Sequence, residues 1–144
     1  MLDRVTLDAS VVISAFSPAE ARAAESLRLL EKLRCYQTAI IVPTLIRPEV
    51  VAAVRLATGD PQKAAALGLS LANLPGVLFQ TLDERMAEDA AAVAAATGLR
   101  GADAVYVATA RRFDALLITL DEEQRSKCPG GVTALSPAEA AERL

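Results

Sequence analysis

The sequence predicts one α/β domain with three layers, in which a parallel sheet of about five strands lies between helices. Three observations support this fold class. Short runs of β-branched and apolar residues alternate along the chain with longer helical patterns. The connections between these segments are short, which favours parallel strands joined by crossover helices on both faces. The length of 144 residues suits a single domain with its own core, so we assign residues 1–144 to it.

The first strand is predicted within residues 5–13, a stretch that is β-branched and apolar apart from Asp8. A lone ionised carboxylate is costly in a buried strand unless a cation or several hydrogen-bond donors meet it. Alternatively, the strand ends at Leu7 and Asp8 caps the turn that follows. Both interpretations stay open at this point, so Asp8 is a candidate for either a structural cap or a functional site.

The following segments are predicted to alternate between helix and strand. Residues 17–20, Ser-Pro-Ala-Glu, have the form of a capping box and predict a helix to about residue 33. A short strand is expected over residues 37–42, then a helix from residue 44 with Glu49 in or near its first turn. The apolar face of the first helix is expected to contain Ala21, Ala24, Leu27, Leu30 and Leu33.

A third helix is predicted to begin after Asp60 and to run to about residue 74. Its segment 64–74 is apolar almost all round. Such a helix is either buried on more than one side in the core or presents a face that docks another chain, and the sequence favours neither. A short strand over residues 77–79 is expected next.

The remaining elements continue the same alternation. Residues 81–84, Thr-Leu-Asp-Glu, predict a second capping box and an alanine-rich helix that stops at Gly98. The next helix, over residues 102–113, holds Asp103 in its first turn. A strand over residues 115–119 leads directly to Asp121. A last short strand at 132–135 and a third capping box at 136–139 complete the pattern.

The composition excludes several kinds of chemistry. There is no histidine, which removes histidine-based catalysis and imidazole-ligated zinc. Cys35 and Cys128 are too few and too far apart for a zinc site or a disulfide framework. The net charge of −3 argues against nucleic-acid binding by bulk electrostatics, although a local basic rim is compatible with it. No apolar run could span a membrane and no secretory signal is evident, so we expect a cytoplasmic protein.

Four acids are predicted at the same edge of the sheet. Asp8 and Asp121 follow the two most apolar strands, while Glu49 and Asp103 lie in the first turns of helices. In a parallel sheet these positions belong to the edge where ligands bind. Like charges repel unless a cation lies between them, and carboxylates with water suit Mg²⁺ or Mn²⁺. A magnesium or manganese site is therefore expected here.

These motifs, in this order, resemble those of a PIN domain. The resemblance rests on Leu-Asp-Ala-Ser at 7–10, Pro-Glu-Val at 48–50, Gly-Ala-Asp-Ala-Val-Tyr-Val-Ala-Thr-Ala at 101–110 and Leu-Ile-Thr-Leu-Asp at 117–121. It covers essentially the whole chain. Among PIN domains, this compact form is most similar to the VapC-like ribonucleases, the toxin subunits of bacterial toxin–antitoxin pairs.

The resemblance implies hydrolysis of RNA with Mg²⁺ or Mn²⁺, an antitoxin protein as partner and a homodimer. It also implies functional residues. The acidic quartet, expected to be catalytic, matches Asp8, Glu49, Asp103 and Asp121, of which Asp8, Asp103 and Asp121 are the expected metal ligands. The hydroxyl positions that support the acids match Ser10 and Thr119. Pro48 departs from the pattern and puts the side-chain position of Glu49 in question.

Other residues near the quartet have less specific expectations. Arg47, Arg100 and Arg125 are candidates for contacts with flanking phosphates, although each also fits a solvated surface charge. Glu122 and Glu123 are expected to be solvated helix residues, and one of them could join the site.

Three other functions compete with a nuclease. An aspartyl-phosphate phosphatase needs a second Asp two residues after Asp8, where this chain has Ser10. A receiver domain needs a strand-end lysine near the acids, and the lysines are at positions 32, 63 and 127. The remaining alternative is a PIN-like binding module without catalysis, which the sequence leaves open.

Overall fold

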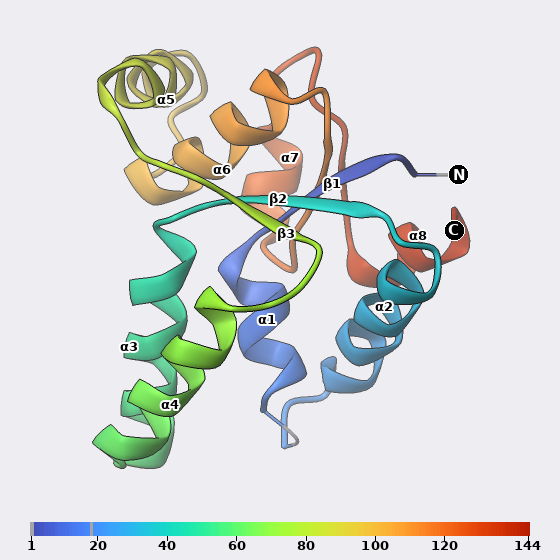
Figure 1. Ribbon diagram of the computed structural model, residues 1–144. Helices are drawn as coiled ribbons and strands as arrows, with labels where there is room; N and C mark the ends of the chain where they lie inside the picture. The colour runs from blue at the N-terminus through green and yellow to red at the C-terminus, as the bar shows by residue number, and fades with distance from the viewer. Residues whose placement is uncertain (1, 18) are drawn as a thin grey trace.

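A five-stranded parallel sheet forms the centre of the computed structural model, which describes residues 2–17 and 19–144. The strand order is β3-β2-β1-β4-β5, and every neighbouring pair is parallel. The strands are β1 (Arg4–Leu7), β2 (Ala39–Pro43), β3 (Val77–Gln80), β4 (Leu116–Ile118) and β5 (Ala134–Leu135). The predicted fold class is confirmed, since helices cover both faces of this sheet (Figure 1).

The helices fall into two groups on either side of the sheet. In Figure 1, α5 and α6 lie on one side and α1, α2, α3 and α4 lie on the other. Contacts between helices pair α2 with α8, α3 with α4 and α5 with α6. The helices are α1 (Ala9–Ala15), α2 (Ala23–Cys35), α3 (Ile46–Thr58), α4 (Pro61–Ala72), α5 (Glu84–Thr97), α6 (Gly101–Arg112), α7 (Glu122–Ser126) and α8 (Pro137–Glu142).

Helix α6 has a long unbroken run of buried residues. All seven residues from 104 to 110 are buried, because α6 packs against α5 as well as against β1, β2 and β4. In this sequence the residues facing both neighbours are small or β-branched, apart from Tyr106, so the helix can approach the sheet closely. This packing fixes the position of any functional side chain that α6 carries.

The first strand is shorter than the apolar stretch that predicted it. It ends at Leu7, and α1 begins at Ala9 with Asp8 as its N-cap, which accepts a hydrogen bond from the Ser10 backbone N–H. Of the two interpretations left open for residues 5–13, this confirms the one in which the strand ends at Leu7 and Asp8 is a cap. The apolar run continues beyond the strand because a short buried helix and a buried strand are both apolar throughout.

The capping box predicted at residues 17–20 is wrong for the residues that the structure describes, which leave out Pro18. The Ser17 hydroxyl donates to the Ile13 carbonyl at the end of α1, and α2 starts at Ala23 after Arg22. The predicted apolar face is also partly wrong, because Leu27 is 46% exposed and the polar Ser26 is buried. A prediction from hydrophobicity places serine on the exposed face. Ser26 can be buried here because its hydroxyl donates a hydrogen bond to the hydroxyl of Ser14. The buried residues of α2 are Ala23, Ser26, Leu29 and Leu33.

The other capping predictions give mixed results. Asp60 caps α4, and Ser136 with Glu139 forms the predicted capping box of α8. In α5 the cap is Asp83 rather than Thr81, since the Asp83 carboxylate accepts from the Met86 backbone N–H. Gly98 ends α5 in the left-handed conformation that glycine adopts without strain.

Helix α4 is not buried on more than one side. Only Ala64 and Leu71 are buried, while Leu69 is 70% exposed, so the core interpretation of this helix is wrong. Its contacts run along α3, and Gly68 lies at their closest approach. Across the described residues, no helix has the length and apolarity needed to cross a membrane.

Gly68→Ala should destabilise the protein even though alanine is the better helix former. A Cβ at this position would lie 2.8 Å from the Val51 Cγ2 atom, and the stiff valine side chain cannot turn away. Overpacking of about 1–3 kcal/mol should exceed the roughly 1 kcal/mol gained in helix propensity. Urea unfolding would measure the change. Val51→Ala should rescue Gly68→Ala, and Ser70→Ala on an exposed part of α4 is the control. A stabilised Gly68→Ala protein would contradict the close packing.

Candidate active site

The four predicted acids lie around the carboxyl edge of the two central strands β1 and β4. This is the point where the chain order of the sheet reverses, and open α/β sheets bind their ligands at such switch points. Asp8 caps α1 directly after β1, and Asp121 caps α7 shortly after β4. Glu49 and Asp103 lie in the first turns of α3 and α6. The sheet therefore gathers side chains from four separate elements.

Asp8 is buried but well supplied with hydrogen bonds. Asp8 is only 7% exposed. Its Oδ2 atom accepts one hydrogen bond from the Ser10 backbone N–H at 3.1 Å and another from Thr119 Oγ1 at 3.2 Å. Burial raises the pKa of Asp8, hydrogen bonds from the side chain and backbone of Ser10 and from Thr119 lower it, and the negative charge of Asp103 raises it again. Burial has the largest effect, so the pKa of Asp8 is raised and its charged form is disfavoured in the fold.

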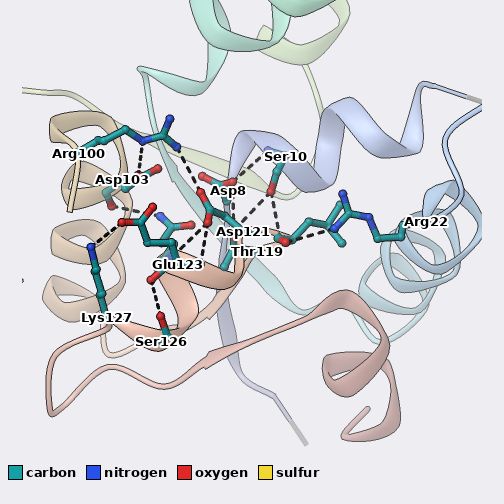
Figure 2. Close-up of polar contacts among 12 residues, drawn as sticks. Asp8, Ser10, Arg22, Arg100, Asp103, Thr119, Asp121, Glu123, Ser126 and Lys127 are labelled. Atoms are coloured by element: carbon teal, nitrogen blue, oxygen red, sulfur yellow. Dashed lines mark hydrogen bonds and ion pairs between the residues drawn. The ribbon is translucent and has the colours of Figure 1, made fainter. Parts of the chain in front are cut away.

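Ser10 and Thr119 connect the ends of β1 and β4, as Figure 2 shows. The hydroxyls of Ser10 and Thr119 lie 3.4 Å apart, and the Thr119 hydroxyl also donates to Asp8. Ser10 Oγ in turn accepts from the Leu120 backbone N–H, and Thr119 Oγ1 accepts from that of Asp121. These two hydroxyls thus link Asp8 to the backbone that positions Asp121.

Arg100 joins two acids from different helices (Figure 2). Its Nε lies 3.0 Å from Asp103 Oδ2, and its Nη2 lies 3.3 Å from Asp121 Oδ2. The other oxygen of Asp121 accepts from backbone N–H groups of α7 as the N-cap. The side chain of Arg100 is 75% exposed, and the two carboxylates raise its pKa. The Arg100 guanidinium thus offsets part of the negative charge of this cluster of acids.

Glu49 contacts the same cluster from α3. Its Oε1 atom accepts a hydrogen bond of 2.6 Å from the hydroxyl of Tyr106. Burial raises the pKa of Glu49, the Tyr106 hydrogen bond lowers it, and the charges of Asp8 and Asp103 raise it further. Glu49, Asp8 and Asp103 are therefore close enough to influence one another, and Pro48 in the first turn of α3 does not turn Glu49 away.

The residues of this cluster fit a hard divalent cation by their chemistry. All donors are oxygens, and the negative charges of three acids oppose one another, which a cation would relieve. As the side chains lie, residues 2–17 and 19–144 contain no group of three or more acids or cysteines arranged to hold a metal ion. Holding one would require the acids to turn toward one another, starting with those that Arg100 contacts.

The three candidate arginines differ in their surroundings. Arg100 is engaged by two site acids, and Arg125 contacts Glu139 at 3.4 Å. Arg47 is exposed in the first turn of α3, with its guanidinium 5.7 Å from the centre of the Phe79 ring. Glu122 and Glu123 have mostly exposed side chains and pair with Arg125 and Lys127 respectively, which suits solvated helix residues.

Two buried residues in contact with the acids were not identified from the sequence. Tyr106 follows Asp103 by three positions, and a buried tyrosine in an otherwise apolar helix was a signal, because its hydroxyl needs a partner. Gln124 is fully buried, and its amide donates to the Asp103 backbone carbonyl at 3.2 Å. Its place in a short polar helix gave no comparable signal.

One family model matches most of the chain. The model of the PIN domain family matches residues 5–128. A comparison with curated proteins gives no match. Among solved structures, similarity extends to VapC20 of Mycobacterium tuberculosis, described as a toxin that cleaves the sarcin-ricin loop, with a TM-score of 0.72 and 13% identity. That match covers 90% of this chain and 98% of the other.

Two further structures show the same fold. A toxin–antitoxin complex from Klebsiella pneumoniae has a TM-score of 0.66 and 20% identity, covering 92% of this chain and 97% of the other. FitAcB from Neisseria gonorrhoeae has a TM-score of 0.69 and 18% identity, with the same two coverages. At these identities the structures establish the fold rather than the activity.

Proposed function

The chain belongs to the PIN domain family, and on this premise we propose that it is a metal-dependent endoribonuclease, the toxin of a toxin–antitoxin pair. One observation carries the proposal: acids from four elements form a single connected cluster at the switch point of the sheet. Burial raises the pKa of Asp8, so keeping this acid in the cluster lowers the stability of the fold. A module that only binds has no need of such an acid. The similar toxin structures support the assignment.

In the proposed mechanism Asp8, Asp103 and Asp121 would hold Mg²⁺ or Mn²⁺. A bound divalent cation offsets the charge of the substrate phosphate and lowers the pKa of water at the site. Glu49 accepts the proton of the attacking water through the oxygen that Tyr106 does not engage. Ser10 and Thr119 keep Asp8 in place while the water attacks phosphorus in line. The P–O bond opposite the water breaks, and the ribose oxygen leaves with a proton taken from solvent.

The arginines contribute differently to the proposed binding of RNA. Arg47 is the best placed to contact a flanking phosphate, because it precedes Glu49 by two residues and, among the described residues, forms no ion pair. Arg100 and Arg125 would first have to leave their carboxylate partners. We propose that Arg100 does so when a cation takes over the charges of Asp103 and Asp121.

The proposed protein partners are an antitoxin and a second copy of this chain. The similar structures include complexes described as toxin–antitoxin pairs. On this chain, Leu56 of α3 and Leu69 of α4 are 86% and 70% exposed, so the α3–α4 pair offers apolar surface for such contacts.

RNA cleavage that depends on a divalent metal is the direct test. Purified protein with labelled RNA and Mn²⁺ is expected to cut internal phosphodiesters, EDTA to stop the reaction, and added Mn²⁺ to restore it. Gel analysis of the fragments would measure this. Cleavage that persists in EDTA would contradict the metal-dependent mechanism. Binding of RNA and Mn²⁺ without any cleavage would instead favour the binding module.

A further inference from the structure

We propose that Tyr106 is a positioning residue, which holds the carboxylate of Glu49 beside Asp8 and Asp103 through its hydroxyl. Tyr106 itself touches neither RNA nor metal in this proposal. The inference rests on the proposed function, because it assigns Tyr106 a role in the reaction that this site carries out. It adds to the acidic quartet a neutral residue that acts through one of the acids.

The contact is short and connects distant parts of the chain. Tyr106 Oη lies 2.6 Å from Glu49 Oε1, and 57 positions separate the two residues in the sequence. Tyr106 is 1% exposed, so water has no access to replace the bond. Hydrogen bonds from a hydroxyl to a carboxylate are typically short and about twice as strong as neutral ones. The contact therefore restrains Glu49 more than an exposed hydrogen bond would.

The direction of this hydrogen bond is fixed by its surroundings. Burial and the charge of Glu49 raise the pKa of the Tyr106 hydroxyl, with a smaller opposite effect from the Ala9 backbone N–H. The hydroxyl therefore stays protonated, and Glu49 is the acceptor. Tyr106 thus supports the ionised form of Glu49 against burial and two neighbouring negative charges. It does for Glu49 what Ser10 and Thr119 do for Asp8.

Helix α6 makes Tyr106 a rigid support. Residues 104–110 are buried, whereas Glu49 lies on α3, has several rotatable bonds and is partly exposed. Without a partner such a side chain would sample several rotamers. Since Asp103 is on the same helix, three residues before Tyr106, a single well-packed element places Asp103 directly and Glu49 through the tyrosine.

Tyr106→Phe tests the proposal because it removes the hydroxyl and keeps the ring. We expect kcat for RNA cleavage to fall about 10- to 100-fold with little change in KM, because the bond acts on Glu49 rather than on RNA. In a Glu49→Gln background, where the carboxylate is already absent, the same substitution should change kcat much less. Tyr36→Phe is the control, since Tyr36 is 57% exposed and outside the site.

A second measurement needs neither cleavage nor a substitution of Tyr106. The chain has two tyrosines and no tryptophan, so Tyr106 is the sole tyrosine of the Tyr36→Phe protein. The tyrosine Raman doublet reports whether the hydroxyl is a strong donor. We expect the strong-donor signature in metal-free Tyr36→Phe protein and its loss when Glu49→Ala is added.

The outcomes separate the inference from the proposed function. A wild-type protein that does not cleave RNA would overturn the proposed function, while the Raman signature would still test the contact. An active wild-type protein with unchanged kcat in Tyr106→Phe, or with equal losses in both Glu49 backgrounds, would overturn the positioning role alone. Absence of the strong-donor signature would overturn it as well.

Discussion

Asp8→Asn is expected to lower RNA cleavage at least about 100-fold while making the metal-free protein more stable near neutral pH. The loss follows because asparagine lacks the negative charge that the proposed metal site needs. The gain follows because burial dominates the surroundings of Asp8 and raises its pKa. Asparagine is an equally good N-cap, so the hydrogen bonds from Ser10 and Thr119 have an acceptor in the variant too.

The gain in stability should depend on pH in a defined direction. At pH values below both pKa values Asp8 is neutral in the folded and unfolded states. As pH rises, the unfolded chain loses the Asp8 proton first, because the folded state has the raised pKa, so the wild type loses stability until the folded carboxyl has also ionised. The difference from Asp8→Asn should therefore be small near pH 3 and grow as pH rises through the folded pKa, to about 1.4 kcal/mol for each unit of raised pKa.

Urea unfolding in EDTA at several pH values would measure this difference. Asp60→Asn is a matched control, because Asp60 is also an N-cap but lies at the start of α4, away from the acidic cluster. A variant of Asp8 that is both inactive and less stable at neutral pH would show that the carboxylate has a structural role beyond capping.

Mn²⁺ should stabilise the wild-type protein strongly and leave Asp103→Asn nearly unchanged. A ligand that binds only the folded state at 100 times its Kd adds about 2.7 kcal/mol, which corresponds to a Tm increase of roughly 5–10 °C for a chain of this size. Asp103 contributes charge to the cluster at Asp8 and Glu49, so its neutral variant should lose most of this increase. Thermal unfolding with and without Mn²⁺ would measure the effect.

Asp103→Asn also removes the ion pair with Arg100, and Asp89→Asn is the control for that loss. Asp89 binds Arg112 at 2.8 Å on the surface of α5, as Asp103 binds Arg100, but it does not belong to the acidic cluster. It should retain the full Mn²⁺ effect. Equal stabilisation of the wild type and Asp103→Asn would contradict the assignment of Asp103 as a metal ligand.

The fold was predictable from the sequence because apolar strand patterns and longer helical patterns alternate along the chain. Five strands in parallel followed from apolar runs joined by short connections, and caps such as Asp60 and Gly98 marked helix ends. The predictions were wrong where a polar residue, Ser26, is buried, and where one apolar stretch continues from β1 into α1. Local patterns cannot report which helices pack together, and the buried face of α2 depends on its packing against α1, where Ser26 meets Ser14.

The site was predictable in its charges but not in its neutral contacts. Four acids at the ends of strands or the starts of helices could be placed at one edge by topology alone. The bonds of Tyr106 to Glu49 and of Gln124 to Asp103 join residues whose distance depends on side-chain packing, which no spacing rule describes. The bridge from Arg100 to Asp121 spans 21 positions and was missed for the same reason.

The pairing of β1 with β4 also bears on how the protein is made. The strand that begins near the N-terminus cannot complete its hydrogen bonds until residues 116–118 have been synthesised. The contact between Ser10 and Thr119 spans 109 positions, and Asp121 follows only then. A nascent or prematurely terminated chain that lacks this region has neither the central strand pair nor the complete acidic cluster. The acidic cluster can therefore assemble only after most of the chain has been synthesised.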